Sequence, residues 1–178
     1  MDTLFLPQAN LLLACLETAL AANPNPPAKI CLAWDDPIAN LGLDGDDCCE
    51  GTAYVNMIEY YPSSNLFPDR TIERQSGPCG VVAWALRLQA TVFRCWPDDG
   101  LTRISCAEQT AAVEQLYHDA QAIRTALCCF KAANQAGLTP ATRGLLIAIT
   151  DNQPIAPQGG CAGNKGTVSV QVPQCGQC

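Results

Sequence analysis

WALRLQATV, residues 84–92, is the stretch that decides the fold of this chain. Every second side chain from Trp84 to Val92 is apolar, and Arg87, Gln89 and Thr91 occupy positions between them. A period of two with one apolar face predicts a β-strand that covers a core. The turn sequence Pro-Asp-Asp-Gly at 97–100 predicts the end of that strand.

A long amphipathic helix is predicted after this turn. Ser105 and Glu108 have the spacing of a capping box, in which each side chain bonds the free backbone N–H of the other residue. Apolar residues then recur at intervals of three and four from Val113 to Phe130, which is one stripe on about seven turns of helix. A helix of this kind is expected to lie on a sheet.

The flanking segments predict the remaining elements. Pro7 opens a helix that ends at Asn23-Pro24, and residues 62–80 and 151–166 are predicted as loops. Four further strands are expected, at 29–34, 52–61, 144–150 and 167–172. Within the second of these, Tyr54, Ile58 and Tyr60 are expected on one face and Val55 and Met57 on the other. The predicted class is therefore α/β (α+β), as one domain over 1–178: a mostly antiparallel sheet with two helices packed on it, in the order α-β-β-β-α-β-β.

Composition favours a protein that is covered by partners. Hydrophobic residues make up 48% of the 178 residues and charged residues only 15%, so polar side chains for the surface of a free monomer are few. The net charge is −7, and the first 60 residues hold nine acidic residues against one basic residue, Lys29. Without a stripe of Lys and Arg, a nucleic-acid-binding groove is not expected, and an acidic surface would repel passing DNA.

The sequence predicts no enzyme and no cofactor. His118 is the only histidine, it is expected on the exposed side of the long helix, and no nucleophile elbow, P-loop or dinucleotide motif occurs. The acidic run at 44–47 does not fit an EF-hand loop, because Cys49 and Val55 stand where glycine and glutamate are needed.

Twelve cysteines suggest a mixture of disulfides and buried thiols. If 52–61 and 81–95 form a hairpin, Cys48 or Cys49 comes close to Cys95, which makes these three the candidate disulfide residues. Cys175 and Cys178 form a C-X-X-C, but a zinc site needs two more ligands, so no metal is predicted.

The N-terminal segment gives two interpretations. Leu12-Leu13-Ala14-Cys15 resembles a lipoprotein box, but no Lys or Arg precedes it and polar residues interrupt the apolar run. A retained helix is therefore favoured over a signal sequence, and no membrane span is expected.

Residues 12–175 resemble the tail terminator proteins of long-tailed (siphovirus-type) phages of actinobacteria. The resemblance rests on segments that occur in order, and these are LETAL at 16–20, NPNPP at 23–27, DDCCEG at 46–51, YPSS at 61–64, Cys79-Gly80 before the long strand and Ser105-Cys106 before the long helix.

The resemblance implies a structural virion protein. Copies of the chain would form a ring, usually a hexamer, that caps the tail tube at the head-tail junction and joins it to the head-side connector or stopper. The expected partners are other copies of itself, the major tail tube protein, the connector and DNA that passes without sequence-specific binding. Synthesis in the host cytoplasm and location in the virion tail follow. The loops 35–51 and 62–78 are the predicted contact segments. The alternatives are another connector layer (stopper or adaptor), an exported cysteine-rich binding protein or lipoprotein, and a zinc or redox module.

Overall fold

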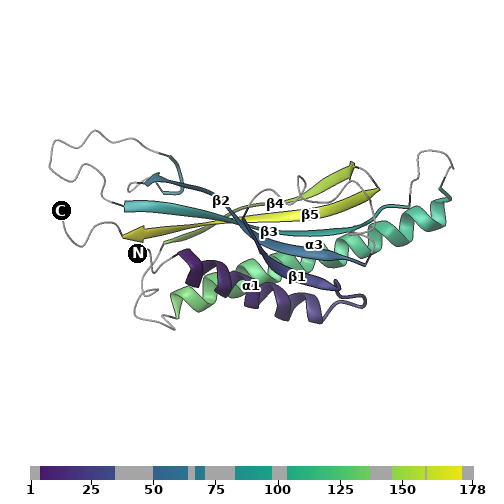
Figure 1. Ribbon diagram of the computed structural model, residues 1–178, viewed down its shortest axis with the longest axis horizontal. Coiled ribbons are helices and arrows are strands. Elements are labelled where there is room, and N and C mark those ends of the chain that lie inside the picture. The colour runs from purple at the N-terminus through teal and green to yellow at the C-terminus, as the bar shows by residue number, and fades with distance from the viewer. Residues whose placement is uncertain are drawn as a thin grey trace.

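In the computed structural model, the residues that can be described form two helices lying against one five-stranded sheet (Figure 1). The structure describes residues 5–34, 50–63, 67–70, 83–97, 104–136, 146–158 and 160–173. The elements in chain order are α1 (Phe5–Ala21), β1 (Lys29–Ala33), β2 (Thr52–Ser63), β3 (Ala83–Cys95), α3 (Cys106–Gln135), β4 (Ile147–Gln158) and β5 (Cys161–Pro173). The predicted class and the order α-β-β-β-α-β-β are confirmed.

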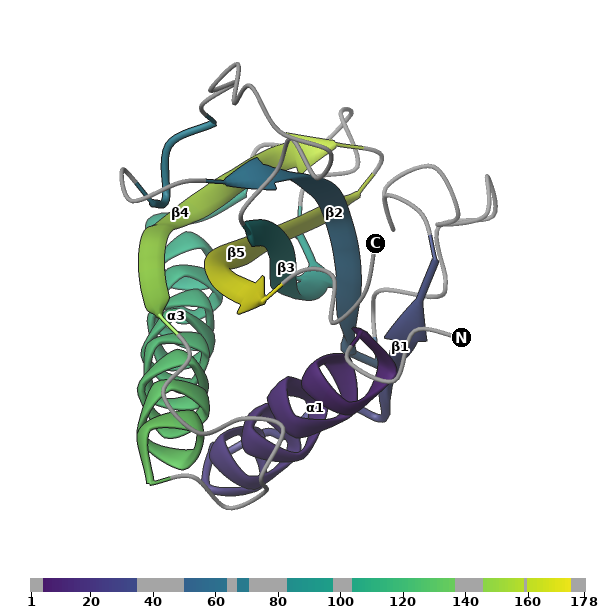
Figure 2. The same cartoon turned by 90° about the vertical axis from the view of Figure 1, so that its left-hand side faces the viewer.

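The sheet has the strand order β1-β2-β3-β5-β4, with β1 and β4 at its edges. β1 pairs in parallel with β2, and every other pair is antiparallel. The central strand is β3, and its side chains at Leu86, Leu88 and Ala90 are at most 1% exposed, as the alternation in 84–92 predicts. Both helices cover this same apolar side of the sheet (Figure 2).

α3 lies directly on β5, and this contact explains one wrong loop prediction. Residues 161–166 continue β5 instead of belonging to a loop. A Cβ atom on Gly166 would lie 2.5 Å from Ile123 and 2.9 Å from Leu127 of α3. Glycine at 166 is therefore required for the helix to approach the strand, and is not a turn signal here.

The prediction of a loop at 151–158 is wrong for a different reason. β4 runs through Pro154 and Pro157 to Gln158. Because β4 is an edge strand that pairs only with β5 among the described residues, a proline whose missing N–H faces outward removes no ladder bond. A register shift between Ile155 and Gln158 accommodates the second proline.

The prediction that Tyr60 shares a face of β2 with Tyr54 is wrong, because this strand contains a β-bulge. The register shifts between Met57 and Glu59, which places one extra residue, Ile58, in β2. Tyr60 therefore lies on the helix side with Met57 and not with Tyr54, because the extra residue changes the parity of the strand. This bulge matters for the surface described below.

A buried hydrogen bond and a disulfide join the two helices. Buried Gln8 of α1 donates a hydrogen bond to the side-chain oxygen of Asn134 in α3 at 3.1 Å. A disulfide joins Cys15 and Cys129, whose Cα atoms are 5.9 Å apart. Gln8, a polar residue within the largely apolar α1, is thus part of the helix–helix contact.

The capping box of α3 is present as predicted, with Ser105 accepting a hydrogen bond from the Glu108 N–H. Replacing Ser105 by alanine should lower the free energy of unfolding by about 1 kcal/mol, because the helix loses an N-cap. Urea titrations of wild type, Ser105→Ala and Ser105→Thr measure this loss. The threonine variant keeps a capping oxygen and should stay near wild type, and equal losses in both variants would contradict the role of the cap.

The same cap gives a pH dependence. Hydrogen bonds from Ser105, first from its backbone and then from its side chain, hold the pKa of Glu108 below its ordinary value of 4.5. A lowered folded-state pKa stabilises the fold above pH 4.5 and loses this effect as the pH falls through the folded value. Glu108→Gln lacks this carboxylate, so its urea midpoint should be lower than that of wild type at pH 7. The two midpoints should converge near pH 3, where Glu108 is protonated as well. A difference that grew on acidification would contradict this sign.

Candidate interaction surface

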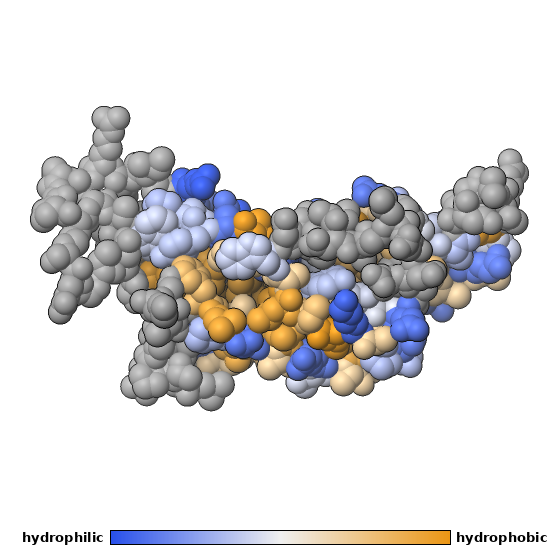
Figure 3. Space-filling model, viewed as in Figure 1, coloured by the Kyte–Doolittle hydropathy of each residue, from blue (hydrophilic) through white to orange (hydrophobic). Residues whose placement is uncertain are grey.

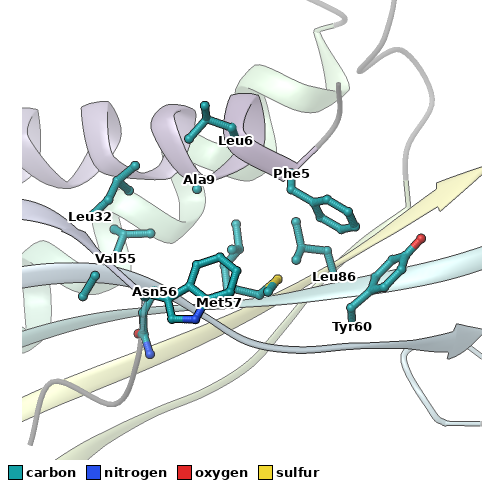
Figure 4. A pocket seen from close by; sticks show the side chains of 12 residues that line it. Phe5, Leu6, Ala9, Leu32, Val55, Asn56, Met57, Tyr60 and Leu86 are labelled. Atoms are coloured by element: carbon teal, nitrogen blue, oxygen red, sulfur yellow. The ribbon is translucent and has the colours of Figure 1, made fainter. Parts of the chain in front are cut away.

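An apolar groove of about 520 Å³ opens between α1, β1 and β2. It is lined from α1 by Phe5, Leu6 and Ala9, from β1 and its end by Leu32, Ala33 and Trp34, from β2 by Val55, Asn56, Met57 and Tyr60, and from β3 by Leu86 and Leu88 (Figure 4). None of these side chains carries a charge, and Asn56 is the one amide among them. We call this surface the α1–β1 groove.

Aromatic packing shapes one end of the α1–β1 groove. The ring of Tyr60 meets Phe5 edge-on at 4.6 Å between centroids and stacks on Trp84 at 4.4 Å. Tyr60 reaches these rings because the bulge at Ile58 turns it to the helix side. The first turn of α1 is thereby held above β2 and β3, which leaves the hollow beside it open toward β1.

The side chains at the outer rim of the α1–β1 groove are exposed. Trp34 is 85% exposed and Leu6 is 61% exposed. Figure 3 shows hydrophobic residues gathered over α1 and β1 on this face of the molecule. Large contiguous apolar surfaces on a free chain are unfavourable and mark contacts with partners or ligands. The chemistry available to the groove is therefore burial of an apolar partner.

A second cluster is buried and structural. The Arg94 guanidinium donates two hydrogen bonds to the Asp119 carboxylate, from Nε at 2.7 Å and from Nη2 at 2.8 Å. Nη2 also donates to the carbonyl of Asn25 at 2.8 Å, and Asn23 donates to Asp119 at 2.9 Å. Asp119 is fully buried and Arg94 is 6% exposed, so the pair fixes β3, α3 and the segment that follows α1 to one another.

The opposite side of the sheet carries a network around Tyr61. The buried Tyr61 hydroxyl donates to the carbonyl of Pro68 at 2.8 Å, and the Arg87 guanidinium lies 5.1 Å from its ring. Arg87 also bonds the carboxylate of Glu59. These groups pair with one another across β2 and β3, so they stabilise the strand pairing.

The three candidate disulfide residues have a mixed outcome. Cys95 is disulfide-bonded, as is Cys161. Thr52 lies opposite Phe93 in the antiparallel pairing of β2 and β3, so the predicted hairpin exists. Cys48 and Cys49 lie outside the described residues, and their pairing with Cys95 stays a prediction. Cys31, Cys106 and Cys128 are free thiols.

Other predicted features can be placed in part. His118 is exposed on α3. The acidic loop up to residue 49, most of 62–78 and the Cys175/Cys178 pair lie outside the described residues. Across the described ranges, no three His, Cys, Asp or Glu side chains come together in a way that could hold a metal ion. In that part of the chain, neither helix combines the length and the apolarity that crossing a membrane requires.

The sequence did not predict the α1–β1 groove or the Cys15–Cys129 bridge. The only available signal for the groove was Trp34 at the end of a short strand, and it could not show that α1 stands beside that strand. The bridge depends on how two helices lie against each other, which spacing along the chain does not specify.

No protein-family model matches the sequence, and no curated protein matches it.

Proposed function

We propose that this chain is a structural subunit that assembles through the α1–β1 groove, and that the assembly is the ring-shaped tail terminator of a long-tailed phage. The observation that carries the proposal is an uncharged hollow of about 520 Å³ whose rim includes an 85% exposed tryptophan. The residue resemblance described above supports the terminator in particular. The ring would lie in the virion, at the head-tail junction, after synthesis in the host cytoplasm.

Charge supports a passage for DNA more than a binding site for it. The whole chain has a net charge of −7. Basic residues that would neutralise phosphates are few, and an acidic wall repels the DNA backbone. The expected partners are other copies of the chain, the tail tube protein on one side and the head-side connector or stopper on the other.

Mass photometry of the purified chain, alone and mixed with the tail tube protein, tests this function. We expect a closed particle with a mass near six copies of the 18.9 kDa chain. Particles of that mass should also bind the ends of tail tubes in negative-stain images. A chain that remains monomeric in both conditions would contradict the proposal, and a ring that binds connector but not tubes would assign it to a neighbouring connector layer.

Half-cystines favour a second candidate, an exported disulfide-bonded binding protein whose groove holds an apolar ligand. Cys15, Cys95, Cys129 and Cys161 are all disulfide-bonded, and disulfides persist in oxidising compartments. A lipid-anchored version would need the Cys15 sulfur for acylation, yet that sulfur is bonded to Cys129.

Thiol titration of purified virions distinguishes the two candidates. A virion subunit is made in a reducing cytoplasm, so its bridges would form after assembly or release. We expect the chain to be present in virions with fewer than twelve titratable thiols per copy. Twelve free thiols per copy would contradict the late oxidation, and absence of the chain from virions would favour the exported protein.

A further inference from the structure

Exposed apolar side chains occur at the other edge of the sheet as well. Ile149 of β4 is 40% exposed and Leu146, just before this strand, is 53% exposed. Tyr117 of α3, 73% exposed, lies one helical turn before Ala120, whose carbonyl accepts a hydrogen bond from Asn152 of β4. We call these three residues the β4 edge.

The β4 edge and the α1–β1 groove lie on opposite sides of the molecule. β1 and β4 are the two outermost strands of the sheet, and Figure 2 shows them at opposite ends of the curved sheet, with α1 below β1 and α3 below β4. Two different surfaces on opposite sides allow each copy to bind one neighbour by each surface. Repetition of such a head-to-tail contact produces a ring when the rotation closes.

Among the described residues, the outer backbone of β4 pairs with no other strand. The stretch from Ile147 to Gln153 has no proline and a single charge, Asp151, although prolines and lysines are the usual protection of an exposed edge strand. Pro154 and Pro157 interrupt only the second half of β4. The first half can therefore accept a neighbouring strand.

Side-chain direction places Ile149 on the correct side for the groove. Ile149 pairs with Val168, whose fully buried side chain lies on the helix side of the sheet. Leu32 of β1 pairs with Val55, which lies on the same side. Within one chain β4 runs antiparallel to β1. A β4 strand of a second copy added antiparallel beside β1 therefore keeps the helices of both copies on one side of the sheet and points Ile149 into the α1–β1 groove.

Shape and area favour this pairing over contact between two grooves. Two hollows of about 520 Å³ would enclose a void if they faced each other, and voids forfeit packing energy. At about 200 Å² for each large side chain, the exposed parts of Leu6, Leu32, Trp34 and Tyr60 amount to roughly 400 Å². That is half of the ~800 Å² per partner that stable interfaces bury, and paired strand backbones with polar rim contacts would supply the remainder.

We infer that the β4 edge of one copy docks on the α1–β1 groove of the next, with the first half of β4 lying beside β1 and Ile149 and Tyr117 covered by the contact. This inference rests on the proposed function only in requiring that the chain self-assembles. It names the two surfaces that the assembly uses, and it makes every contact in the ring the same.

Three double-lysine variants with equal charge changes test the inference. Leu6→Lys with Trp34→Lys changes the groove, and Tyr117→Lys with Ile149→Lys changes the edge. Thr18→Lys with Thr125→Lys is the control, because both threonines are exposed and bond only carbonyls of their own helices. Mass photometry should show assembly of the control as in wild type and at least tenfold weaker self-association of the groove and edge variants.

An equal mixture of the groove and edge variants is the decisive sample. Each variant retains one intact surface, so the mixture should form dimers with one copy of each variant and nothing larger. Thermal melting verifies folding, and Trp34→Lys and Ile149→Lys alone replace any double variant that melts early.

Three results would overturn the inference. If wild type assembles and the groove and edge variants assemble equally well, the surfaces are wrong while the assembly function stands. If the groove variant is monomeric, the edge variant assembles and the mixture gives no new dimer, then two grooves pair or a different partner fills the groove. If wild type itself is monomeric alone and with tube protein, both the inference and the proposed function fail.

Discussion

Replacing Cys15 and Cys129 together by alanine should lower the free energy of unfolding by about 4 kcal/mol. Their disulfide spans 114 residues of sequence, and a cross-link of that length removes much of the conformational entropy of the unfolded chain. The additional half-cystines at Cys95 and Cys161 also restrict the unfolded chain, so the loop-entropy value of about 4.7 kcal/mol for a 100-residue loop is an upper estimate. Guanidinium titration of the oxidised proteins measures the difference.

Cys128 provides the matched control for this change. It is the neighbour of Cys129 on α3, and it is an exposed free thiol. Cys128→Ala should change the free energy of unfolding by less than about 0.5 kcal/mol. If the double variant were as stable as Cys128→Ala under oxidising conditions, the bridge between α1 and α3 would not stabilise the fold.

Replacing Asp119 by alanine should cost about 3–5 kcal/mol, because it leaves the buried Arg94 charge without its partner. The same change removes the acceptor for Asn23 and Gln115, whose amides also donate to this carboxylate. Glu114, an exposed acidic residue of the same helix, is the control, and Glu114→Ala should lie within about 0.5 kcal/mol of wild type.

The double variant Arg94→Met with Asp119→Leu separates the two contributions to that cost. Removing both charges avoids an unpaired buried ion, so the double variant should be more stable than Asp119→Ala alone. Urea titrations of wild type, Asp119→Ala, Glu114→Ala and the double variant give the comparison. A double variant that is less stable than Asp119→Ala would show that hydrogen bonds to Asn23 and Asn25, and not the buried charge, dominate.

These two features concern the same region, the contact of the helices with each other and with β3. None of the changed residues lines the groove. The Cys15/Cys129 double variant and Asp119→Ala are therefore expected to weaken the fold without altering the exposed residues of the assembly surfaces. Assembly assays on them, carried out where they remain folded, would therefore separate stability from partner binding.

Local sequence patterns determined the elements of this protein and the side that each one buries. The alternation in residues 84–92 placed β3 in the middle of the core, and the capping box fixed the start of α3, because both signals depend on neighbours within a few residues. The same locality explains the errors. Prolines and glycines predict a loop at 151–166, but Pro154 is tolerated in an edge strand. The strand also continues through 161–166, where Gly166 allows α3 to approach.

The tertiary structure alone decided everything that depends on distant segments. The Cys15–Cys129 bridge, the Arg94–Asp119 pair and the α1–β1 groove each join parts of the chain that are far apart in sequence. Periodicity shows which side chains are buried, but it does not specify what lies opposite them, because that choice is made by packing among whole elements. The bulge at Ile58 adds one residue to β2, and this local change turns Tyr60 into the groove.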